Sequence, residues 1–80
     1  MDNTTITAKI SNGCLSIVKP VENKESDEKF ISKAICLAYE SNISLVFYRL
    51  DNDIIIILNN FGNYNVELEK IAEKITNFQD

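Results

Sequence analysis

The sequence predicts an α+β fold of order ββαββα, with one four-stranded antiparallel sheet and two helices packed on one of its faces. Two hairpin turns, Asn12-Gly13 and Asp51-Asn52, each separate two runs of strand-forming residues. An amphipathic segment with apolar residues at helical spacing follows each hairpin. The two halves also resemble each other at a shift of forty residues, which indicates a pseudo-repeat of two ββα units.

Residues 6–18 are predicted to form the first hairpin. Asn-Gly is a strong signal for a two-residue turn, because both of its residues must take positive φ. With Asn12 and Gly13 at the tip, one side of the hairpin is mostly polar and the other is apolar. The apolar side, which we expect to face the core, carries Ile6, Ala8, Ile10, Leu15 and Ile17.

A charged connection, residues 19–25, leads to a helix predicted from about Asp27 to Glu40. Ser26 is a suitable N-cap, and Asp27 and Glu28 match the positive end of the helix dipole. The apolar residues fall on one broad arc at helical spacing. This arc comprises Phe30, Ile31, Ala34, Ile35, Leu37 and Ala38.

The second hairpin, predicted from about Ile43 to Leu58, is apolar on both sides. A strand that faces water on one side should alternate apolar and polar residues, but the run Ile54–Leu58 does not. One side pairs Val46 with Ile57, Tyr48 with Ile55, and Leu50 with Asp53. The other side pairs Leu45 with Leu58, Phe47 with Ile56, and Arg49 with Ile54.

A second helix is predicted from about Val66 to Phe78, after the loop at residues 59–65. Asn65 is a suitable N-cap, and Glu67 and Glu69 lie in the positively polarised first turn. The apolar stripe of this helix comprises Leu68, Ile71, Ala72, Ile75 and Phe78.

The helices can cover only one side of the second hairpin, and we expect them to cover the side that carries Val46, Tyr48, Leu50, Ile55 and Ile57. The forty-residue match aligns this side with the core side of the first hairpin. Arg49 lies on the other side, and an arginine rarely faces apolar helices. A turn longer or shorter by one residue would exchange the sides of one strand against the other. The uncovered side, our predicted dimer or partner interface, comprises Leu45, Phe47, Arg49, Ile54, Ile56 and Leu58.

Three possibilities remain for what covers this side. It is a second copy, a different protein, or the chain itself, through its N-terminal segment, its 59–65 loop or a strong twist of the sheet. A second copy stacked about a twofold axis is the simplest. We therefore expect a small acidic, non-enzymatic protein-interaction module that forms a homodimer. It would act as an adaptor, a chaperone-like factor or an inhibitor of a protein partner.

The 59–65 loop is a second candidate for recognition. It combines asparagines with aromatic residues of the kind enriched at interfaces. The alternative is that the asparagines form turns and caps while the aromatic rings pack over the helix end. The candidate residues are Asn60, Phe61, Asn63 and Tyr64.

Composition sets limits on chemistry. The 80 residues predict a single domain, with residues 1–4 and 79–80 frayed. The chain has no histidine, only two glycines, and no metal-ligand spacing, so we expect no catalytic, cofactor-binding or metal-binding residues. Cys14 and Cys36 are expected to be reduced.

The net charge of −4 disfavours direct binding to nucleic acid or to a membrane. The sequence has no signal-peptide pattern and no membrane-spanning apolar run, which predicts the cytoplasm of a bacterium or of an infected host cell. An alternative function is an acidic inhibitor, encoded by a phage or bacterium, that blocks a nucleic-acid-binding site on a defence or DNA-handling enzyme. That function would require clustered carboxylates.

Overall fold

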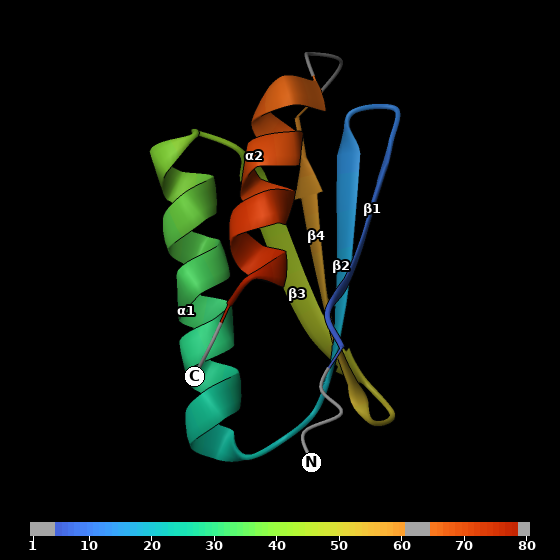
Figure 1. Ribbon diagram of the computed structural model, residues 1–80, viewed down its shortest axis with the longest axis vertical. Coiled ribbons are helices and arrows are strands. Elements are labelled where there is room, and N and C mark those ends of the chain that lie inside the picture. The colour runs from blue at the N-terminus through green and yellow to red at the C-terminus, as the bar shows by residue number, and fades with distance from the viewer. Residues whose placement is uncertain (1–4, 61–64, 79–80) are drawn as a thin grey trace.

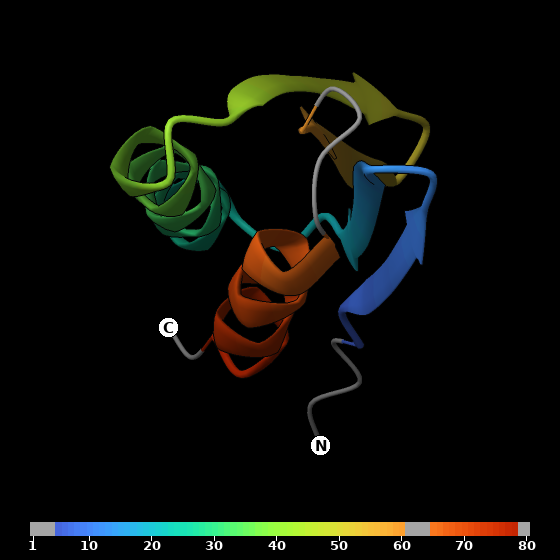
Figure 2. The same cartoon turned by 90° about the horizontal axis from the view of Figure 1, so that it is seen from above.

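A computed structural model, which describes residues 5–60 and 65–78, has the predicted ββαββα order. The strands form one antiparallel sheet in the order β1-β2-β4-β3, and both helices lie on the same face of it (Figure 1, and from above in Figure 2). Residues 1–4 and 79–80, which were predicted to fray, lie outside the described residues. The elements are β1 (Thr7–Ser11), β2 (Cys14–Pro20), α1 (Lys24–Glu40), β3 (Ser44–Leu50), β4 (Asp53–Asn59) and α2 (Asn65–Thr76).

Both hairpins have the predicted turns and registers. Asn12 and Gly13 take φ values of 53° and 75°, as the turn between β1 and β2 requires. At the second turn Asp51 has a φ of 56°. The β3–β4 ladder pairs Phe47 with Ile56 and Tyr48 with Ile55, in the register that the sequence predicted.

Helix α1 begins earlier than predicted. Its N-cap is Asn23, whose Oδ1 accepts a hydrogen bond of 2.8 Å from the backbone N–H of Ser26. Ser26 is therefore inside the helix rather than at its cap. It is buried there, and its hydroxyl donates to Oε1 of Glu22 at 2.8 Å. Asparagine and serine both favour the N-cap position, and the use of Asn23 in place of Ser26 adds a turn to the helix.

The hydrophobic core lies between the sheet and the two helices. Phe30 and Phe78 close one end of it with an edge-to-face contact, their ring centroids 5.6 Å apart. Helix α1 contributes four buried apolar residues rather than the whole predicted arc. The buried apolar residues are Leu15, Ile17, Phe30, Ala34, Leu37, Ala38, Ile43, Ile54, Ile56, Leu58, Leu68, Ile71 and Ile75.

The face assignment predicted for the second hairpin is wrong. Strand β4 pairs with β2 so that Leu15 lies opposite Leu58 and Ile17 opposite Ile56. Because Leu15 and Ile17 face the helices, Ile56 and Leu58 face them too and are fully buried. The residues assigned to the core, in contrast, lie on the face that the helices leave open. Those open-face residues are Val46, Tyr48, Leu50, Ile55 and Ile57.

The reason for the error is the parity of the repeat. An odd number of positions separates the turn at Asn12-Gly13 from the turn at Asp51-Asn52, whereas the shift of forty is even. Side chains alternate between the two faces of a strand. Matching the halves at an even shift, when their turns lie an odd number of positions apart, therefore assigns the residues of β4 to the wrong faces. The helices depart from the repeat as well, since Ile75 is buried but its match, Ile35, is 44% exposed.

Candidate functional site

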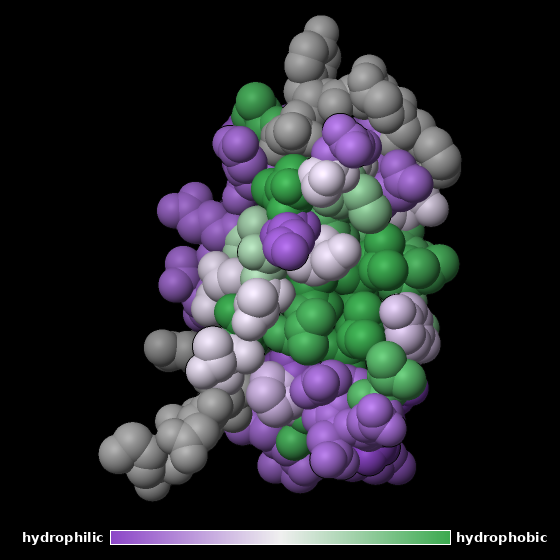
Figure 3. Space-filling model, turned by 90° about the vertical axis from the view of Figure 1, so that its right-hand side faces the viewer, coloured by the Kyte–Doolittle hydropathy of each residue, from purple (hydrophilic) through white to green (hydrophobic). Residues whose placement is uncertain are grey.

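Exposed apolar side chains are concentrated on β3. Of the seven large apolar residues that are exposed in the described part of the chain, four lie on this strand: Val46, Phe47, Tyr48 and Leu50. Three of them project from the open face of the sheet, where they continue into the partly exposed Ile55 and Ile57 of β4 and Val18 of β2. Figure 3 shows this apolar band across the middle of the open face. The open-face patch is Val18, Val46, Tyr48, Leu50, Ile55 and Ile57.

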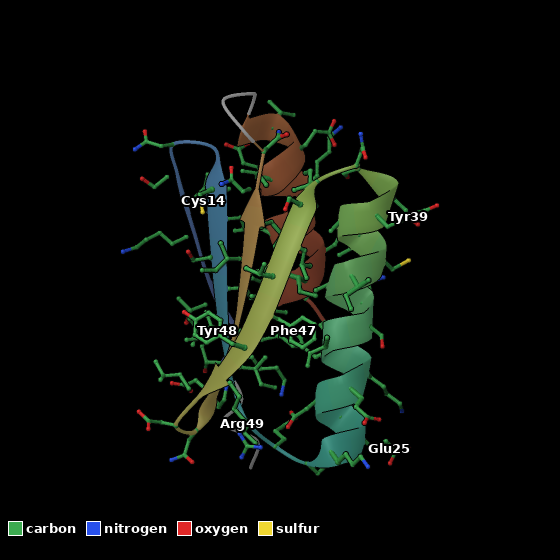
Figure 4. All side chains as sticks on the ribbon, turned by 180° about the vertical axis from the view of Figure 1, so that it is seen from behind. Cys14, Glu25, Tyr39, Phe47, Tyr48 and Arg49 are labelled. Carbon is green, nitrogen blue, oxygen red and sulfur yellow. The ribbon has the colours of Figure 1, made fainter. Side chains whose placement is uncertain are left out.

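Phe47 extends the apolar surface around the edge of the sheet. Its side chain points toward α1, whereas that of Tyr48 points to the opposite side (Figure 4). Between the start of α1 and the end of β3 lies a pocket of about 510 Å³. Its apolar walls are Val21, Ile31, Phe47 and Ile54, and its charged lining includes Arg49 and Glu28.

The predicted interface residues are divided between core and surface. Ile54, Ile56 and Leu58 are buried beneath the helices, and Leu45 packs against the same core. Phe47, which is 48% exposed, and Arg49 reach the surface. Arg49 lies on the helix side, but at the sheet edge, where its guanidinium stays in water. The charge of Arg49 therefore did not indicate which face the helices cover.

The interface prediction missed Val46, Tyr48 and Leu50. The odd spacing of the two turns agrees with their exposure, but only the pairing of β2 with β4 decides which side the helices cover. Of the predicted loop, Asn60 is described: its backbone N–H donates to the carbonyl of Gly13 at 2.8 Å and so continues the pairing of β2 with β4. Phe61, Asn63 and Tyr64 lie outside the described residues.

Lys19 forms a buried charged cluster where β2 leads into α1. Its ammonium lies 3.1 Å from Oδ1 of Asp27, 3.3 Å from Oε1 of Glu22 and 3.1 Å from the carbonyl of Pro20. It also lies 5.5 Å from the ring centroid of Phe30. Three oxygens thus accept the three N–H groups of the ammonium. This geometry joins the end of the strand to the first turn of the helix.

Three carboxylates around the start of α1 lie beside cations. Asp27 and Glu22 are bound by Lys19, and Glu25 lies 4.0 Å from Lys29. The start of α1 therefore presents a mixed surface, which offers no specific support for mimicry of a nucleic-acid backbone.

The described residues, 5–60 and 65–78, contain no group of three potential metal ligands. Within the same ranges, neither helix is long and apolar enough to cross a membrane. The thiols of Cys14 and Cys36 are free. Comparison with protein-family models, with curated proteins and with solved structures finds no match for this chain.

Proposed function

We propose that this protein is a small non-enzymatic protein-interaction module that works as a homodimer, with β3 and the open-face patch in the interface. In this form it would serve as an adaptor, a chaperone-like factor or an inhibitor of a protein partner. The single observation that carries the proposal is the run of exposed apolar residues on β3.

The free energy available from covering this surface supports the proposal. Val46, Tyr48 and Leu50 each expose about half of their surface. With the partly exposed residues beside them, the patch is on the order of 400 Å², near the largest found on soluble monomers. A contact along β3 gains part of the free energy of burying the whole patch, which at about 25 cal/mol per Å² is about 10 kcal/mol before the costs of association. That is comparable to the whole stability of a small domain.

A second copy is the simplest partner, because a twofold axis brings the same patch onto itself. The test is molecular mass by light scattering over a concentration series. We expect the parent to approach the mass of a dimer at micromolar to millimolar concentration. Val46→Asp should remain monomeric, because it places a carboxylate in the middle of the apolar surface.

Val66→Asp is the matched control. Val66 is 54% exposed and Val46 is 58% exposed, so the two substitutions remove the same side chain at similar exposure. Val66 lies in the first turn of α2, where a carboxylate is tolerated. This variant should dimerise like the parent. A parent that stays monomeric throughout the series, or equal dimerisation of both variants, would refute the proposal.

A further inference from the structure

β3 is an edge strand with few of the features that usually prevent edges from pairing, and Arg49 is its one charged residue. It has seven residues and contains no proline, no lysine and no bulge in its pairing with β4. The other edge, β1, is shorter, has five residues, and carries Lys9 on its open face. Figure 4 looks directly onto the β3 edge, and no described segment lies across it.

The register of the hairpin determines which backbone groups of β3 are free. Leu50 and Asp53 flank a two-residue turn, so they form the hydrogen-bonded pair that closes the hairpin. Hydrogen bonding alternates along a strand, so Ser44, Val46 and Tyr48 also bond to β4. The N–H and C=O groups of Leu45, Phe47 and Arg49 consequently point away from the sheet.

We propose that β3 of one copy pairs antiparallel with β3 of a second copy about a twofold axis, which gives a continuous eight-stranded sheet. This inference rests on the proposed homodimer and specifies its geometry. With the axis at Phe47, Leu45 of each copy lies opposite Arg49 of the other. The outward-pointing N–H and C=O groups of Leu45, Phe47 and Arg49 in both copies then form hydrogen bonds between the two strands. On the open face Val46 then lies beside Tyr48 of the second copy, so the pairing covers the margin of each open-face patch along β3 and joins the remainder of the two patches into one surface.

Area and charge both favour a second copy as the added strand. Two strands of about 23 Å, with the side chains on both faces, bury on the order of 1,000 Å² in total, the lower limit for a specific interface. Among the described residues Arg49 has no ion pair, and the last turn of α1 contains no basic residue. Because α1 and β3 run in opposite directions, the antiparallel pairing carries Arg49 of the second copy to the negative end of the α1 dipole.

Amide hydrogen exchange of the parent at low and high concentration tests this geometry. The amides of Leu45, Phe47 and Arg49 should exchange about tenfold more slowly when nine-tenths of the chains are dimeric, because exchange then proceeds through the remaining monomer. Ala8 and Ile10 are the controls. Their amides point outward from the β1 edge and should exchange at the same rate at both concentrations.

Arg49→Glu should also weaken dimerisation by about tenfold, because it places a carboxylate at the negative end of α1. Lys9→Glu, which reverses an exposed charge on β1, should have no such effect. A dimer in which the three β3 amides keep exchanging at the monomer rate would overturn the edge pairing but leave the homodimer intact. A parent that never associates would overturn both.

Discussion

Lys19 shows how a single residue can be charged and yet belong to the core. Its side chain is 1% exposed, and that of Asp27 is 15% exposed. Taking an ammonium out of water is costly, and the nearby carboxylates offset that cost only while both are present. The carboxylate of Asp27 also accepts hydrogen bonds of 3.1 and 3.3 Å from the backbone N–H of Glu22, so it fixes the turn that leads into α1.

Asp27→Ala should therefore destabilise the fold more than Lys19→Met. The first leaves a buried cation short of a partner and should cost about 3 kcal/mol. The second replaces the cation by an apolar chain of similar volume and should cost about 1 kcal/mol or less. Urea unfolding in a Val46→Asp background measures both changes on the monomer. Equal losses of unfolding free energy in the two variants would mean that the buried ammonium of Lys19 does not depend on Asp27.

Strand β4 illustrates how neighbouring residues of one element can have opposite roles. Ile56 is fully buried beneath the helices, whereas Ile55 lies on the open face and is partly exposed. Their chemistry is identical, so only the pairing of β4 with β2 separates them. The run of isoleucines is thus a core strand on one side and an interaction surface on the other.

Ile56→Ala should lower the free energy of unfolding by about 3 kcal/mol, because it opens a cavity in a packed core. Ile55→Ala should cost about 1 kcal/mol in the monomer, since its side chain already contacts water. Urea unfolding in the Val46→Asp background gives both values. A larger loss for Ile55→Ala would mean that the helices cover the other face.

At the scale of the whole molecule, the fold leaves one face and one edge of the sheet bare. Both helices lie on the same side, and β3 forms the outer edge next to α1. The exposed apolar surface of β3 is therefore continuous from the open face, around the edge, to the pocket beside α1. A partner that contacts β3 can use all three parts.

A dimer of this kind makes thermal stability depend on concentration. The melting temperature of the parent should rise by several degrees between micromolar and millimolar protein, because association stabilises only the folded state. Adding salt should change this rise little, since apolar burial is not screened as charge pairs are. Differential scanning calorimetry measures both effects. Val46→Asp should melt at one temperature throughout, and a parent that does the same would contradict self-association.

The sequence alone determined the order of elements, both turns and the register of each hairpin, because these depend on residues close together in the chain. Asn12-Gly13 and Asp51-Asn52 bring their flanking strands together directly, and helical spacing places α1 and α2. It could not determine which side of the second hairpin would be covered. The pairing of β2 with β4, strands distant in sequence, decided that, and a shift of one residue there exchanges the two faces. The candidate surface on β3 is consequently a product of tertiary structure.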